Sequence, residues 1–342
     1  MMKRQELPRA PFFDAEALRI ELTAMFKASD GPDDCRPKVL KRLKELVTDA
    51  HQGARARLEA TAQGRDCAAA LSTFHDELIH LIFDYTAAHV YHPTTSGSRD
   101  EKISVAATGG YGRGLLAPYS DIDLLFILPY RQTPWSESVA EYMLYMLWDL
   151  GLKVGHATRT VSQCVALARS DMTIRTSLLD TRYLLGDREL FEDFETRFRE
   201  DVVKGTAREF IAAKMGERES RHAQTGESRY RVEPNVKDGK GGLRDLHTLH
   251  WLSSYVYGCG LDGEDLPKGV FEDEEIKTFH RSEDFLWTVR CHMHFERGRA
   301  DERLSFDLQP VIAEKLHYRE GDDLLPVERF MRHYFLVAKD VG

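Results

Sequence analysis

Two aspartates at the head of an apolar run constrain this chain more than any other feature. The segment TGGYGRGLLAPYSDIDLLF covers residues 108–126, and within it Asp121 and Asp123 lie two residues apart. Because strand side chains alternate between two faces, both carboxylates share one face while Ile122 and Leu124 point into the core. Two like charges held so close repel each other unless a cation lies between them. The pattern therefore predicts a pair of metal ligands rather than two solvated acids after a glycine turn.

The residues before the aspartates fit a magnesium–nucleotide site. Mg²⁺ takes one or two protein carboxylates and completes its octahedron with water and phosphate oxygens. Glycines at 109 and 110 allow backbone amides to approach phosphates without a Cβ in the way, and Arg113 adds positive charge. A Walker A loop is excluded because no Lys-Ser or Lys-Thr follows these glycines. A dinucleotide fingerprint is excluded because an apolar strand, not a helix, follows them.

Composition limits the class of protein. The 342 residues carry a formal net charge of −9, which argues against a broad nucleic-acid surface. No run approaches the ~20 apolar residues of a membrane span, and the N-terminus lacks the apolar segment of a secretory signal. We therefore expect a cytoplasmic protein without membrane or nucleic-acid partners. The five cysteines lack any CxxC spacing and are expected to be free and buried: Cys35, Cys67, Cys164, Cys259 and Cys291.

Hydrophobic periodicity predicts two helices, then a small mixed sheet with flanking helices, and then an all-α region. The short apolar run 177–185 is expected to be a fourth strand. In chain order the expected elements are helices at 37–64 and 66–91, strands at 103–107 and 122–128, a helix at 134–150, a strand at 152–157, a helix from about 162, the run 177–185, and helices at 187–204, 206–227, 244–257, 272–296 and 324–340.

These elements divide the chain into three predicted parts. A helical lead-in covers residues 1–95, an α/β core covers 96–186, and a helical domain covers 187–342. One interruption within the helical part, residues 229–245, is rich in glycine and in alternating charge, so we expect a structured loop there. From Glu233 to Asp245 this loop either closes over a nucleotide or fixes the helical domain against the sheet.

Two levels of resemblance follow from these motifs. Gly109-Gly110, ten intervening residues and Asp121-x-Asp123 resemble the nucleotidyltransferase signature of the DNA polymerase β superfamily. The wider context GGYGRGLLAPYSDIDLLF, LWDLGLKVGHATRT and EPNVKDGKGGLRDLHTLHWL resembles the bifunctional uridylyltransferase/uridylyl-removing enzyme of bacterial nitrogen regulation. The likeness is strong from residue 103 to about 252, weak in the preceding helices and moderate in those that follow.

The resemblance implies an α/β nucleotidyltransferase core and a Mg²⁺-dependent enzyme. Members of this family transfer UMP from UTP to a tyrosine of the PII signal protein, releasing pyrophosphate, and also remove it hydrolytically. Carried over by position, the expected site residues are Gly109, Gly110, Arg113 and Ser120 for the nucleotide and Asp121 and Asp123 for Mg²⁺.

The general base is the least defined part of the expected site. The superfamily usually places a third carboxylate on a later strand, but the strand at 152–157 contains no acid. Asp180 is the candidate for this catalytic role, and the alternative is an aspartate that ends a strand or caps a helix. The helical pair His247 and His250 has no nearby third ligand, so packing or surface roles are expected for both.

Two other functions stay open at this point. Transfer of AMP is one, because nothing in the phosphate-binding motif reads the base, and a non-catalytic nucleotide-sensing module is the other. Members of the family continue into an HD phosphohydrolase domain and two ACT domains, which residues 1–342 do not resemble, and the isolated pair His75-Asp76 is too little for an HD centre. We therefore expect neither hydrolytic removal of UMP nor a glutamine response from these residues.

Overall fold

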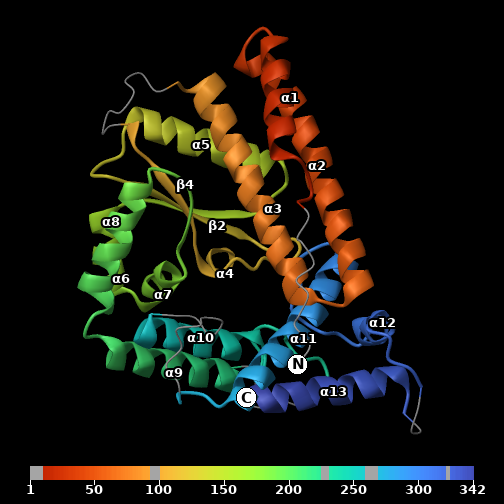
Figure 1. Ribbon diagram of the computed structural model, residues 1–342. Helices are drawn as coiled ribbons and strands as arrows, with labels where there is room; N and C mark the ends of the chain where they lie inside the picture. Colours follow the sequence, from red (N-terminus) through yellow and green to blue (C-terminus); the bar gives the residue numbers. More distant parts are fainter. Residues whose placement is uncertain (1–10, 93–100, 225–230, 259–268, 321–323) are drawn as a thin grey trace.

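A computed structural model describes residues 11–92, 101–224, 231–258, 269–320 and 324–342. A four-stranded sheet lies beside the long N-terminal helices, and a second helical layer, formed by helices between residues 207 and 341, lies below it (Figure 1). In chain order the elements are α1 (Ala15–Lys27), α2 (Pro32–Thr61), α3 (Gly64–Tyr85), the π turn Thr86–Val90, β1 (Ser104–Ala107), α4 (Gly109–Gly112), β2 (Ile122–Leu128), α5 (Pro134–Asp149), β3 (Val154–Thr160), α6 (Val161–Ser170), α7 (Met172–Leu179), β4 (Arg182–Gly186), α8 (Arg188–Phe198), the π turn Arg199–Val203, α9 (Ala207–Gln224), α10 (Leu243–Tyr257), α11 (Asp273–Arg297), α12 (Leu308–Lys315) and α13 (Pro326–Val341).

The sheet has the order β3-β2-β1-β4 and confirms the expected small mixed sheet. β2 pairs parallel to β3, whereas β1 pairs antiparallel to both β2 and β4. The two faces of β2 bury different sets of side chains. Leu124 and Phe126 pack in one core with α3 and α5, whereas Leu125 and Ile127 pack in another with α6 and α8. The strand is therefore buried on both sides, and its position in the molecule is strongly specified.

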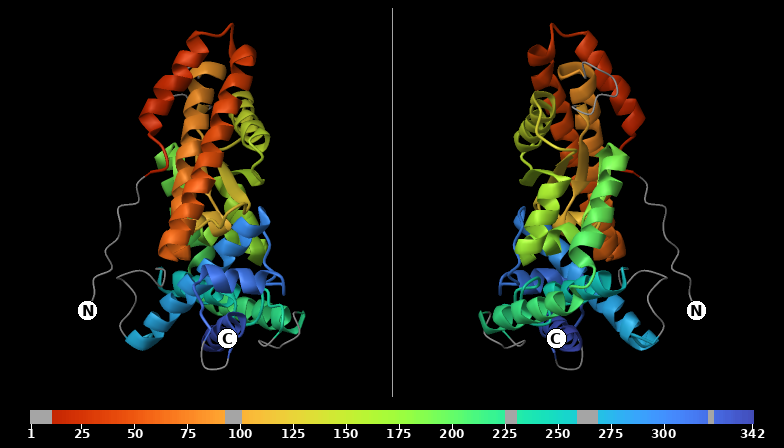
Figure 2. Two further views of the ribbon diagram at one scale, coloured as in Figure 1. Left: turned by 90° about the vertical axis from the view of Figure 1, so that its right-hand side faces the viewer. Right: turned by 90° about the vertical axis from the view of Figure 1, so that its left-hand side faces the viewer.

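The long helices α2 and α3 link the sheet to the lower helical layer. Their upper parts share a core with the sheet, whereas Leu58, Ala68 and Leu71 belong to a core with α11 and α13. Figure 2 shows α1, α2 and α3 side by side along one flank of the molecule. The lead-in helices therefore contribute to both cores. The predicted boundaries at 95 and 186 stay a prediction.

Three expectations about elements are wrong. In the described residues, three α-helices, not two, precede the first strand, because Asp14 caps α1 and Leu18 and Leu22 bury one face of it. Helix α2 begins five residues earlier than predicted, at Pro32, since a proline at the first helical position lacks an amide that would have no partner there. Pro37 instead lies inside this helix.

The third wrong expectation is a strand that covers all of residues 177–185. Residues up to Leu179 belong to the helix α7, whose N-terminus is capped by the Asp171 side chain, and β4 begins only at Arg182. Asp180 is the C-cap residue between the two elements. An apolar run this short does not distinguish a helix from a strand by periodicity, so the local cap decided its conformation.

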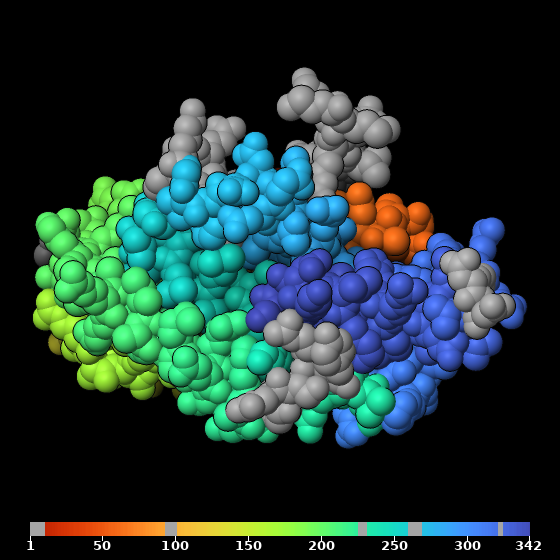
Figure 3. Space-filling model, turned by 90° about the horizontal axis from the view of Figure 1, so that it is seen from below, coloured from red at the N-terminus to blue at the C-terminus, as the bar shows by residue number. Residues whose placement is uncertain are grey.

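The lower helical layer is one continuous body. Seen from below, α9, the first part of α11 and α13 form a single surface on the side away from the sheet (Figure 3). None of the helices within the described residues is long and apolar enough to cross a membrane. The expected free, buried cysteines are confirmed where the structure describes them, and Cys259 lies outside the described residues.

The contact between α3 and α11 generates a stability prediction. A Cβ on Gly64 would lie 2.0 Å from the backbone nitrogen of Thr288, so Gly64→Ala should lower the free energy of unfolding by about 2 kcal/mol or more. Gly216 in α9 has no neighbouring atom within 4 Å of such a Cβ, so Gly216→Ala should raise it by about 0.5–1 kcal/mol. Urea denaturation of both variants tests the pair, and equal effects would contradict this account of the packing.

Candidate active site

The glycine-rich turn is held directly against β2. The amide of Thr108 donates to the backbone oxygen of Asp123 over 3.0 Å, and Gly109 then turns the chain into α4 with φ of +56°. A Cβ on Gly109 would lie 3.2 Å from the Asp123 carboxylate. This left-handed conformation beside a carboxylate explains a glycine at position 109. The structure therefore brings the expected phosphate-binding turn and one metal ligand into contact.

The two aspartates differ in burial. Asp121 is exposed, whereas Asp123 is half-buried. Burial raises the pKa of Asp123 above its ordinary value, and the neighbouring charge of Asp121 raises it further, whereas the Lys237 ammonium lowers it. Gly155 lies beside Asp123 on β3, and a Cβ there would lie only 2.5 Å from an Asp123 oxygen. The absence of that Cβ leaves room around the carboxylate.

This carboxylate pair fits a magnesium ion. A half-buried Asp123 destabilised by Asp121 is an arrangement that a divalent cation would stabilise. Within the described residues there is no group of three or more His, Cys, Asp or Glu side chains that could enclose a metal. Mg²⁺ commonly binds through only one or two carboxylates, with water and phosphate oxygens as its other ligands. Asp121 and Asp123 are therefore the residues that would hold it.

Two expected nucleotide-binding residues lie on different sides of this pair. A Cβ on Gly110 would meet only Arg113, at 3.7 Å, so the position is open to an approaching group. Ser120, by contrast, lines a cavity of about 480 Å³ between α2, the loop before β2 and α11. A separate cavity of about 300 Å³ opens beside Asp123, between β3 and α7. The nucleotide-binding roles of these residues stay predictions.

Asp180 joins the core to the lower helical layer. Its buried carboxylate forms an ion pair with Arg113 and accepts a 2.8 Å hydrogen bond from the indole nitrogen of Trp251 on α10. His250 lies 3.8 Å from the other carboxylate oxygen. A Cβ on Gly112 would lie 1.8 Å from the Asp180 backbone oxygen, so α4 packs directly on this residue. As placed here, Asp180 holds Arg113 beside the glycine turn.

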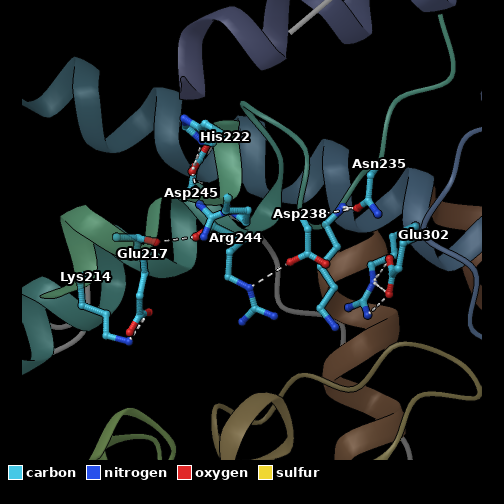
Figure 4. A network of polar contacts seen from close by, with 12 residues as sticks. Lys214, Glu217, His222, Asn235, Asp238, Arg244, Asp245 and Glu302 are labelled. Atoms are coloured by element: carbon cyan, nitrogen blue, oxygen red, sulfur yellow. Dashed lines mark hydrogen bonds and ion pairs between the residues drawn. The ribbon is translucent and has the colours of Figure 1, made fainter. Parts of the chain in front are cut away.

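The loop from Glu233 to Asp245 is structured, as expected. The Asn235 side chain accepts hydrogen bonds from two following amides, over 3.0 and 2.6 Å, and the amide of Val236 donates to the Glu302 backbone over 2.8 Å. Asp245 is buried and binds His222 over 3.0 Å and the amide of Gly241 over 2.8 Å (Figure 4). These contacts tie the loop to α9 and to the segment after α11.

Sequence reasoning named this loop but no residue in it. Lys237 influences Asp123, although the two are more than 100 residues apart in the chain. The alternating lysines and glycines of KDGKGG were the available signal, and they did not indicate which lysine faces the site. His247 is buried in α10, in keeping with the packing role expected for it.

Comparisons with known proteins agree with this geometry. Residues 96–172, which contain the glycine turn and both aspartates, match the nucleotidyltransferase domain, and residues 209–342 match the GlnD PII-uridylyltransferase family. The chain is 53% identical over 331 residues to the bifunctional uridylyltransferase/uridylyl-removing enzyme of Bradyrhizobium sp. (strain ORS 278), covering 96% of this chain and 35% of that protein. The enzymes of the same name from Nitrobacter hamburgensis and Rhodopseudomonas palustris are 53% and 52% identical, over 96% of this chain and 35% and 36% of theirs.

Over nearly its whole length the chain is similar to these bifunctional enzymes, and it contains regions that match the nucleotidyltransferase domain and the GlnD PII-uridylyltransferase family. It spans about a third of the length of the curated relatives it matches. The resemblance inferred from the sequence motifs is confirmed, and so is the expected architecture of an α/β core followed by helices. The aspartate pair lies within the region that matches the nucleotidyltransferase domain, and the loop before α10 lies within the region that matches the GlnD PII-uridylyltransferase family.

The raised pKa of Asp123 generates a second stability prediction. Because the folded chain holds this proton more tightly than the unfolded chain, the ionised carboxylate lowers stability above the folded-state pKa. Without divalent cations, Asp123→Asn should therefore raise the free energy of unfolding at pH 7, and the gain should vanish below the ordinary aspartate pKa of about 3.9.

Denaturation curves at pH 7 and pH 3 measure this difference. Asp193→Asn, which changes an exposed carboxylate on α8, is the matched control and should have little effect at either pH. A loss of stability for Asp123→Asn at pH 7 would show that the charge is not destabilising in the fold.

Proposed function

We propose that this chain transfers UMP from UTP to a tyrosine hydroxyl of a PII signal protein, with release of pyrophosphate. The observation that carries the proposal is the pair Asp121 and Asp123 beside the glycine turn, in a chain half identical to enzymes named uridylyltransferases. We further propose UTP and the PII protein as its partners, Mg²⁺ as its cofactor, and a cytoplasmic location without a nucleic-acid partner.

The proposed reaction divides the work among the site residues. The glycine turn admits the phosphates, and Asp121 and Asp123 hold the cation against them. When bound, Mg²⁺ supplies charge neutralisation on the phosphates and on the leaving oxygen. The tyrosine oxygen forms a bond to the α-phosphorus, the bond from that phosphorus to pyrophosphate breaks, and the hydroxyl proton passes to solvent water. Arg113 adds a fixed positive charge next to Gly110.

The role proposed for Asp180 follows from its contacts. A general base must reach the attacking hydroxyl, whereas the Asp180 carboxylate is bonded to Arg113 and Trp251. This arrangement supports a positioning role, in which Asp180 fixes the guanidinium of Arg113. The general-base role expected from the sequence makes a different kinetic prediction, so the two can be separated.

Asp121→Asn should lower the rate of UMP transfer by on the order of 100-fold or more, since a charged metal ligand provides several kcal/mol of transition-state stabilisation. The test follows labelled UTP into a PII protein at a fixed Mg²⁺ concentration, with Asp193→Asn as the control. Near-normal transfer by Asp121→Asn would remove the basis for the proposed function. Labelling from ATP in place of UTP would instead indicate adenylyl transfer, and nucleotide binding without labelling would indicate a sensing module.

A double-mutant cycle of Asp180→Asn and Arg113→Met separates the two roles of Asp180. If Asp180 acts through Arg113, each single variant and the double variant should lower kcat/KM by similar factors and raise the KM for UTP. If Asp180 is the base, Asp180→Asn should lower kcat alone, and the two effects should multiply. We expect the first result, because Asn keeps the Trp251 contact but loses the charge that holds Arg113.

A further inference from the structure

Three cations from separate segments surround Trp251 where the core meets the lower helical layer. Arg113 after α4, Arg244 on α10 and Lys214 on α9 lie 5.7, 5.6 and 5.3 Å from the centroid of its ring. Figure 4 shows Arg244 and Lys214 extending from their helices toward the core. Each cation has a carboxylate partner, which is Asp180, Asp238 and Glu217 respectively.

A fourth cation, Lys237, lacks such a partner. Within the described parts of the chain, its ammonium has neither an ion pair nor a hydrogen bond. Burial lowers the pKa of Lys237 below its ordinary value and the charge of Arg290 lowers it further, whereas the carboxylates of Glu302 and Asp238 partly offset this. A half-buried ammonium without a direct ion pair would bind an approaching anion favourably.

His247 lies in the same positive electrostatic field. It is 5% exposed, and neither ring nitrogen has a hydrogen-bond partner among the residues that the structure describes. Burial lowers the pKa of His247 well below its ordinary value, and the charges of Arg113, Arg244 and Arg290 lower it further. These three arginines therefore act on His247 even though each of them also has a carboxylate partner.

The loop that carries Lys237 is held in place. The Asn235 side chain accepts a hydrogen bond from the Lys237 amide over 3.0 Å, and the Lys237 backbone oxygen accepts one from the Arg244 backbone amide over 2.7 Å. Arg244, at the end of the loop, and Arg113, which follows the glycine turn, lie 5.6 and 5.7 Å from the centroid of the same Trp251 ring, so the loop ends close to the turn. The backbone of the loop is thus ordered before any ligand arrives, which lowers the entropic cost of binding an anion.

We propose that Lys237 and Arg244 bind the β- and γ-phosphates of the nucleoside triphosphate whose α-phosphate reacts beside Asp121 and Asp123. This assignment rests on the proposed function and adds to it. The lower helical layer then takes a direct part in catalysis by holding the pyrophosphate that leaves. The ligand chemistry is a polyphosphate, recognised through its charge and independently of the base.

The test is a calorimetric titration of the full chain with inorganic tripolyphosphate, UTP and UMP at constant Mg²⁺. Lys237→Met and Arg244→Met should each weaken binding of tripolyphosphate and UTP by about tenfold or more, because each removes a charge-assisted contact. Binding of UMP, which lacks the two outer phosphates, should change by less than about twofold. Lys204→Met is the matched control, since Lys204 is an exposed lysine paired with Glu200, and it should leave all three affinities unchanged.

Three further measurements keep the test decisive. Lys237→Arg retains the charge and should retain polyphosphate binding, which separates loss of contact from loss of folding. In the unaltered chain, tripolyphosphate should change the fluorescence of Trp251 as Arg244 moves from the ring to the phosphates. Thermal melts of each variant check that the fold is intact.

Unchanged binding of tripolyphosphate and UTP in both methionine variants would overturn the assignment, even if UMP transfer proceeds normally. Equal weakening of UMP and UTP would also overturn it, because the contact would then lie at the α-phosphate or the nucleoside. Polyphosphate binding that is lost in the variants, in a chain that never labels a PII protein, would support this site and count against the proposed function.

Discussion

A pair of like charges, one of them half-buried, is the constraint on which the site depends. Asp123 can lie on a strand buried on both faces only because the sheet holds it there and other groups offset its charge. Glycines at 109 and 155 leave the space around its oxygens open. Lys237 approaches from the opposite layer and lowers the electrostatic cost of the ionised carboxylate. The carboxylates and the cations therefore stabilise each other across the interface.

The interface itself is built from close backbone packing. Gly112 brings α4 onto the end of α7, and Gly64 brings α3 onto α11, in both cases at distances that a Cβ would prevent. Asp180 then bonds to one residue from each side, Arg113 and Trp251. Because α2 and α3 share cores with the sheet and with the lower helices, the two layers are held in one arrangement. The position of the cations relative to the aspartates follows from this packing.

This arrangement divides recognition between the two layers. The sheet supplies the carboxylates beside the glycine turn, and the helical layer supplies positive charge. In the proposed reaction these groups would recognise phosphates and not a base, so polyphosphate binding and choice of nucleotide would be separate physical problems. The cavity of about 300 Å³ beside Asp123, lined by β3 and α7, is the nearest space in which other parts of a substrate would fit.

Local sequence patterns were enough to predict the glycine–aspartate motif and most of the helices. The motif from Gly109 to Asp123 was readable because a glycine turn and a strand with period-2 carboxylates need only neighbouring residues, and most helices followed from periodicity over many turns. The short run 177–185 was misassigned because nine residues with five apolar side chains fit either a helix or a strand.

Contacts between distant segments were decided only by the tertiary structure. The sequence could nominate Asp180 as a third carboxylate, but its partners lie 67 and 71 residues away, beside α4 and on α10 respectively. Lys237 looked like one of several loop lysines until folding left it half-buried and close enough to Asp123 to lower the pKa of that carboxyl. Charge, burial and pairing depend on which elements pack together, and no periodicity along the chain encodes that.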